Sequence, residues 1–226
     1  SSLQGVILES AKNIANVVKR TNQIYENALG GLATQKISAL KKSKKQVIKL
    51  TSEVDDLRDN IFFFIKNLDE SSVEASGFYI NILGYLQDIT QSLEYISKMS
   101  YKHVNNNHKK LKFNQVKELK EIYDKLEILF MDTQNAFKTG AFEEIGVIIK
   151  EKKEVYDLVK SKIQSQVNRT RTEESNPKNT ALYFSVLLET KDLINAIMNL
   201  LEEYHNAHDS SIVPATISTG DKSGDK

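Results

Sequence analysis

Acidic side chains at matched positions are the first residues of this chain that could do chemistry. Asp55 and Asp59 stand four residues apart, which places both on one face of a helix. Carboxylate oxygens at that spacing suit Mg, Ca, Mn or Fe ions. Acids on the flank of a long amphipathic helix are more often solvated or paired with lysine, so both interpretations stand. Three further pairs of acids are each separated by 101 residues: Glu53 and Glu154, Asp56 and Asp157, and Asp88 and Glu189.

A second candidate is the polar segment that runs from His103 to His108. Its two histidines are five residues apart, whereas helical zinc pairs prefer four, and the chain has no HExxH pattern. Asparagine at a helix end readily adopts left-handed geometry and bonds the last carbonyl groups. We therefore interpret the segment as a capping turn formed by five polar residues: His103, Asn105, Asn106, Asn107 and His108.

Lysines form the third group of candidates. The runs Lys41-Lys42, Lys44-Lys45 and His108-Lys109-Lys110 with Lys112 could contact phosphate or lipid headgroups, although solvated helix ends are the better explanation. Lys152 and Lys191 fall at expected core positions, where they either extend to solvent or pair with acids such as Glu189 and Asp192.

The remaining composition argues against several functional classes. The chain has no Gly-rich phosphate loop, no nucleophile elbow and no Ser/His/Asp arrangement, so we expect no enzyme. The formal net charge is +1 and aromatics are not interleaved with the basic runs, so we expect no nucleic-acid partner. The chain lacks cysteine, which excludes disulfides and thiolate chemistry.

The elements that must position these residues are long helices. Apolar residues alternate at steps of three and four over six segments, and the 226 residues include only two prolines. Breaks are expected at Gly30-Gly31, Ser71-Ser72, Asn105 to Asn107, Gly140 and Ser175-Asn176-Pro177. We therefore predict an all-α fold of six long antiparallel helices, arranged as two tandem three-helix bundles. The expected parts are 1–104, a linking turn at 105–111, 112–208 and a disordered tail at 209–226.

One offset relates the two expected halves. A shift of 101 residues aligns Glu53-Val54-Asp55-Asp56-Leu57 with Glu154-Val155-Tyr156-Asp157-Leu158, and it also aligns Leu86 with Leu187. Because a single offset serves two different helices, an internal duplication is a better explanation than chance similarity of heptads.

Two stretches carry a resemblance to a known family. The stretch from Tyr85 to Ile96 and the turn His-Val-Asn-Asn-Asn-His at 103–108 resemble the PhoU-like carboxy-terminal cytoplasmic domain of bacterial sodium/phosphate cotransporters. The resemblance implies a PhoU-like helical fold and a non-catalytic regulatory or interaction domain of a sodium-dependent inorganic phosphate transporter. It also implies a place on the cytoplasmic side of the inner membrane, with the transmembrane transporter domain of the same polypeptide as partner. The abrupt start at Ser1 is expected for such a fragment.

Two alternatives to the tethered transporter domain are a free-standing PhoU-type regulator of phosphate uptake and a generic helical scaffold. An exposed side of the helices would allow pairing of two copies in a homodimer.

The resemblance also allows a divalent metal ion as cofactor, without making one certain. Family members can bind iron, zinc or other metals through an acid followed four residues later by Asp. Here Glu94 is followed by Lys98, and the matching positions of the other half are Asn195 and Asn199, so the motif is only partly kept. For a divalent metal ion, the first-half candidates are Asp55, Asp59, Asp88 and Glu94, and the second-half candidates are Glu154, Asp157, Glu189 and Asp192, although the shift of 101 aligns Asp55 and Asp59 with Tyr156 and Lys160.

Overall fold

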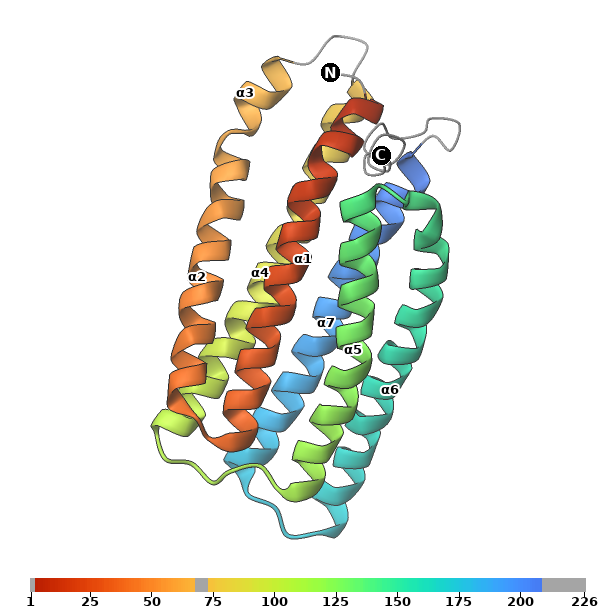
Figure 1. Cartoon of the computed structure of the whole chain (residues 1–226). Coiled ribbons are helices and arrows are strands. Elements are labelled where there is room, and N and C mark those ends of the chain that lie inside the picture. Colours follow the sequence, from red (N-terminus) through yellow and green to blue (C-terminus); the bar gives the residue numbers. More distant parts are fainter. Residues whose placement is uncertain (1–2, 68–72, 209–226) are drawn as a thin grey trace, which may run out of the picture.

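The chain folds as an all-α bundle, as the apolar spacing predicts. The computed structural model describes residues 3–67 and 73–208. Six long helices and two short ones follow one another: α1 (Leu3–Thr34), α2 (Ile37–Asp59), α3 (Ile61–Lys66), α4 (Val73–Asn105), α5 (Phe113–Thr139), the 3-10 helix η2 (Phe142–Glu144), α6 (Ile145–Thr172) and α7 (Pro177–Ala207). Figure 1 shows the long helices lying side by side along one axis.

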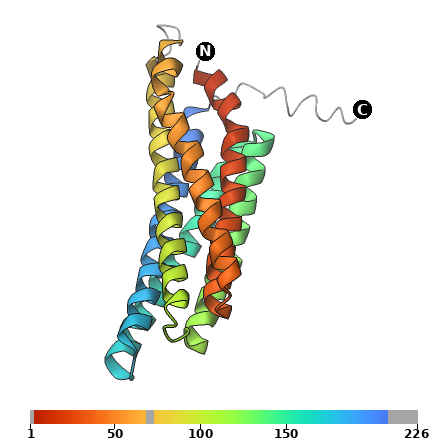
Figure 2. The same ribbon diagram turned by 90° about the vertical axis from the view of Figure 1, so that its left-hand side faces the viewer.

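The centre of the bundle is formed by four helices. α1 packs on α4 and on α5, and α4 packs on α7, while α2 covers α1 and α4, and α6 covers α5 and α7. Figures 1 and 2 show α2 and α6 at opposite edges of this arrangement. One hydrophobic cluster includes residues of all six long helices, so the two expected halves share a core.

The apolar seam positions explain why these helices pack. Ile14 of α1, Leu50 of α2 and Leu126 of α5 are at most 2 % exposed, and all lie on the stripes that the spacing predicts. The run of five apolar residues from Ile61 to Ile65 behaves differently. It forms α3, in which Phe62 and Phe63 are each 62 % exposed.

The expected break at Gly30-Gly31 is wrong. Both glycines lie inside α1, which continues to Thr34 and turns at Gln35 with a positive φ of 55°. A Cβ atom at Gly31 would lie 2.8 Å from Cγ of Leu40, so glycine is needed here for the close approach of α2. The glycine pair is therefore a packing feature rather than a helix terminator.

The other predicted helix ends have identifiable caps. Gly140 follows α5 with φ of 74°, and Asn107 follows α4 with φ of 58°. The side chain of Asn176 accepts a hydrogen bond from the backbone N–H of Asn179, and Pro177 opens α7. The expected break at Ser71-Ser72 and the expected tail at 209–226 lie outside the described residues.

Residues that a shift of 101 aligns have matching environments. The shift relates α2 to α6 and α4 to α7. Val54 and Val155 are 1 % and 3 % exposed, and Leu86 and Leu187 are 3 % and 0 % exposed. This agreement supports the duplication, which stays a prediction.

Across residues 3–67 and 73–208, no helix is long and apolar enough to cross a membrane.

Candidate functional site

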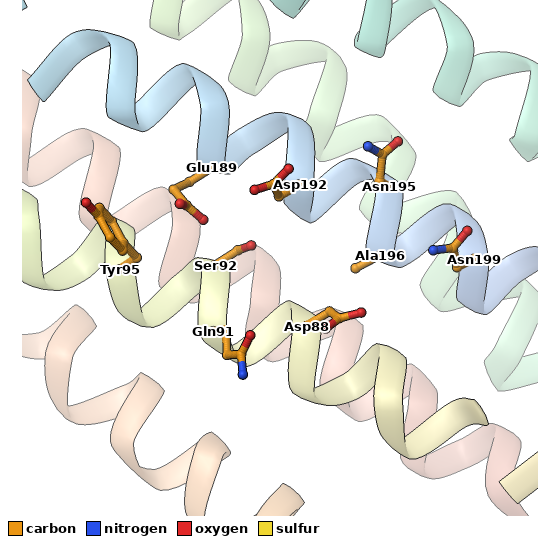
Figure 3. Close-up of a pocket in the computed structure, with 9 residues that line it drawn as sticks. All are labelled: Asp88, Gln91, Ser92, Tyr95, Glu189, Asp192, Asn195, Ala196 and Asn199. Atoms are coloured by element: carbon orange, nitrogen blue, oxygen red, sulfur yellow. The ribbon is translucent and has the colours of Figure 1, made fainter. Parts of the chain in front are cut away.

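A polar pocket of about 450 Å³ lies on the seam between α4 and α7. Helical spacing explains its lining, because residues three or four apart project from the same side of a helix. Figure 3 shows the side chains facing one another across the two helices. The lining residues are Asp88, Gln91, Ser92 and Tyr95 of α4, and Glu189, Asp192, Asn195, Ala196 and Asn199 of α7.

Asp192 repels the carboxylates of Asp88 and Glu189 in this pocket. Partial burial raises the pKa of Asp88, and the nearby negative charge of Asp192 raises it further. The pKa of Glu189 is raised by the same two causes, although a hydrogen bond with the Ser92 side chain opposes the shift. The pocket therefore favours positive charge or protons at these acids.

Metal binding by this pocket has a geometric test. Within the described part of the chain, no group of three or more His, Cys, Asp or Glu side chains is placed so that it could hold a metal ion. Asp88, Glu189 and Asp192 share a pocket, but their arrangement does not amount to a coordination shell. The described residues therefore do not fit the kind of metal centre that the family resemblance suggests.

The other predicted acids lie apart from this pocket. Asp55 and Asp59 of α2 both lie near Arg58, with nitrogen–oxygen distances of 3.8 and 3.5 Å. The structure therefore does not bring these two acids together with Asp88, and it pairs them with a cation of their own helix. Glu53, two residues earlier, accepts two hydrogen bonds from Arg20 of α1, at 2.6 and 2.9 Å.

Lysine also neutralises acids elsewhere on α4 and α6. Glu94 lies 2.7 Å from Lys98. Asp157 lies 2.9 Å from Lys153, and Glu154 is exposed on the same helix. Each of these acids has the ordinary environment of a charged residue on a helix surface.

The two lysines expected in the core have a different partner from the one predicted. Lys152 is 7 % exposed, and its Nζ lies 5.2 Å from the ring centre of Tyr156 on the same helix, while Nζ of Lys191 lies 5.6 Å from that ring. In the described structure neither lysine forms an ion pair, so of the two alternatives the pairing of Lys191 with Glu189 or Asp192 is not the one adopted. Those two acids line the α4 side of α7, whereas Lys191 reaches α6.

The turn after α4 is tightly held. The His103 ring is 4 % exposed, and its Nε2 donates a hydrogen bond of 2.7 Å to the carbonyl oxygen of Lys109. The backbone N–H of His108 bonds the carbonyl of His103 at 3.1 Å, and the two imidazole rings are 5.2 Å apart. Asn105 ends α4, and Asn106 and Asn107 bond the carbonyls of Lys102 and Val104.

One polar network was missed from the sequence. Arg169 of α6 donates two hydrogen bonds of 2.8 Å to Glu118 of α5, and the Tyr183 hydroxyl of α7 donates to the same carboxylate at 2.5 Å. One feature of the sequence could have indicated buried polar contacts here. Gln166 continues the apolar register of Val159 and Ile163, and a polar residue at such a buried position needs hydrogen-bond partners. The network joins three helices near one end of the bundle.

Comparison with known proteins supports the fold. No known protein family and no curated protein matches the sequence. Among solved structures, the chain is similar to the phosphate transport system regulatory protein PhoU from Streptococcus pneumoniae, with a TM-score of 0.71 and 13% identity. The match covers 92% of this chain and 96% of that one. The chain therefore has a six-helix, PhoU-like fold, as the resemblance implies.

Proposed function

We propose that this chain is a non-catalytic regulator of phosphate transport that acts by contacting other proteins, as a free-standing PhoU-type protein. The observation that carries the proposal is the structural match to a phosphate transport regulatory protein, which extends over nearly the full length of both chains. The polar pockets of the bundle provide charged contact surfaces, and the proposal assigns no chemical turnover to them.

The test is a measurement of labelled phosphate uptake in the source organism. We expect in-frame deletion of residues 3–208 to change the rate of uptake, or its response to phosphate starvation, and a plasmid copy to restore it. A matched control is a plasmid copy carrying Asp124→Asn, an exposed change on α5 that we expect to be neutral. Uptake that is identical with and without the chain, under both phosphate conditions, would refute the proposal.

A second proposal is more specific about the protein to which this chain belongs. The stretch from Tyr85 to Ile96 and the turn from His103 to His108 favour the cytoplasmic domain of a sodium/phosphate cotransporter, tethered to a transmembrane domain of the same polypeptide at the inner membrane. Sequencing the transcript upstream of the codon for Ser1 tests it. Membrane-spanning segments in the same reading frame would support the tethered form, and a start codon without such segments would leave the free-standing regulator.

A further inference from the structure

The end of the bundle where α4 stops and α7 begins contains a second pocket, of about 260 Å³. This volume is below the range of about 300–1,000 Å³ that is usual for drug-sized ligands, and the apolar part of the lining is Met99, Ala181 and Leu182. The polar residues that line it are Lys102, His103, Asn106, His108, Lys178 and Ser185.

The charge of this pocket has one sign. Its lining contains two lysines and two histidines and no acid. Residues 95–117, which include the turn, carry six lysines and two histidines without a single Asp or Glu, although the whole chain has a net charge of only +1. The turn after α4 and the lining of the pocket are therefore positively charged.

The lowered pKa of His108 agrees with positive charge around this pocket. Desolvation lowers the pKa of its imidazole, and the positive charges of His103, Lys178 and Lys102 lower it further. These groups come from α4 and from α7, so cations face His108 from both sides of the pocket. An anion placed among them would relieve this repulsion.

The turn that forms one wall of the pocket is held in place by hydrogen bonds within the chain. His103 is anchored by its 2.7 Å hydrogen bond to the carbonyl of Lys109. The Asn179 side chain of α7 is 3 % exposed and donates a 3.0 Å hydrogen bond to the carbonyl of Lys110. The turn is thus tied both to α4 and to α7, and binding would require little ordering of the backbone.

The hydrogen-bond donors that line the pocket suit a ligand with anionic oxygen atoms. Ammonium, amide and hydroxyl groups donate hydrogen bonds to anionic oxygens, and those bonds are strong when one partner is charged. The same positive charge disfavours divalent cations. We propose that this basic pocket binds a phosphate-type oxyanion, supplied as free inorganic phosphate or as the phosphate of a lipid headgroup.

The inference goes beyond the proposed function, because it concerns the isolated chain and needs no transporter. Calorimetry with inorganic phosphate, at constant ionic strength in chloride buffer, tests it directly. We expect saturable binding that the double variant Lys102→Ala/Lys178→Ala weakens at least tenfold. The matched control Lys120→Ala/Lys153→Ala removes the same charge from exposed lysines of α5 and α6 outside the pocket and outside residues 95–117, and we expect it to bind as the unmodified chain does.

A second readout follows the imidazole directly. In proton NMR titrations, phosphate should raise the pKa of His108 in the unmodified chain, and the effect should be much smaller in Lys102→Ala/Lys178→Ala. This measurement also checks that the variant is folded, because the dispersed spectrum is recorded in the same experiment.

The source of the phosphate group is settled by a flotation assay. Vesicles of phosphatidylcholine with and without phosphatidylglycerol are compared for the unmodified chain and both double variants. Lysine-dependent binding to anionic vesicles without binding of free phosphate assigns the site to a lipid headgroup, and the reverse result assigns it to the free ion. The proposal is overturned if neither ligand binds, or if both double variants lose binding equally.

Discussion

Asp192 carries the charge that governs the acidic pocket between α4 and α7. Its carboxylate raises the pKa of Asp88 and of Glu189, beyond the effect of their partial burial. A raised pKa in the folded state means that these two groups contribute stability below their unfolded pKa values of about 4. That contribution is lost as the pH rises through the folded pKa values.

Asp192→Asn should therefore stabilise the folded chain at pH 7, because it removes the repulsion. All these residues are at least partly exposed, so we expect a modest rise in melting temperature, of about 1–2 °C. The gain should disappear at pH 3, where Asp88 and Glu189 are protonated. Thermal denaturation at both pH values measures it, and an unchanged or lower melting temperature at pH 7 would contradict the repulsion.

Glu118 has the opposite electrostatic character. Burial tends to raise the pKa of its carboxyl group, but the hydrogen bonds from Arg169 and Tyr183 outweigh it and hold the pKa below the ordinary value. Its ionised form therefore stabilises the fold above the unfolded pKa, and this contribution is lost as the pH falls through the folded pKa.

Glu118→Gln should destabilise the chain at pH 7 by about 2–4 kcal/mol, because it leaves the half-buried guanidinium of Arg169 without its anion. The difference from the unmodified chain should shrink below pH 4. Urea denaturation measures both quantities. The control is Asp124→Asn, which breaks an exposed pair with Lys120 and should cost about 0.3–0.5 kcal/mol. Equal losses in the two variants would show that the three-helix network adds nothing.

At the scale of elements, substitutions at the two neighbouring glycines of α1 allow the effect of helix propensity to be distinguished from the effect of packing. A Cβ atom at Gly30 would meet nothing within 4 Å, whereas one at Gly31 would lie 2.8 Å from Leu40, a buried residue of α2. Only the second glycine is required by the contact between α1 and α2.

Gly30→Ala should stabilise the chain by about 0.5–1 kcal/mol, since alanine is the better helix former. Gly31→Ala gains the same propensity but must displace Leu40, and overpacking of a core costs about 1–3 kcal/mol. We expect net destabilisation of Gly31→Ala, measured by chemical denaturation. Two stabilised variants would mean that α2 can move away from α1 at little cost.

At the scale of the whole molecule, the two expected halves pack against each other. Tyr25 of α1 stacks on Tyr123 of α5 at 6.2 Å and hydrogen bonds Thr190 of α7 at 2.8 Å. Phe78 of α4 lies 4.9 Å from Tyr204 of α7 in an edge-on contact. Removing either half would expose these large side chains to water.

Fragments 3–108 and 109–208 should therefore not unfold cooperatively when each is purified alone. Their large exposed apolar surfaces should make them associate. Mixing the two fragments should restore a cooperative thermal transition, recorded by circular dichroism. A sharp transition in either separate fragment would instead establish that half as an independently folding domain.

The sequence by itself determined the helical content and most helix ends. The three-and-four spacing identified the seam, because that period is a property of one helix, and the caps at Asn107, Gly140 and Asn176 are local as well. The burial of Gly31 could not be anticipated, because it depends on how closely a second helix approaches.

Only the tertiary structure decided which polar residues meet. Spacing placed Asp88, Glu94 and Asp59 alike on helix flanks, but side-chain pairing separated them. Asp88 faces Asp192 across two helices, whereas Glu94 and Asp59 lie near cations of their own helices. The basic pocket likewise needs Lys102 and Lys178, which are distant in sequence and adjacent only because α4 packs on α7. Periodicity fixes which side of a helix is buried, while the packing of helices fixes which residue lies opposite.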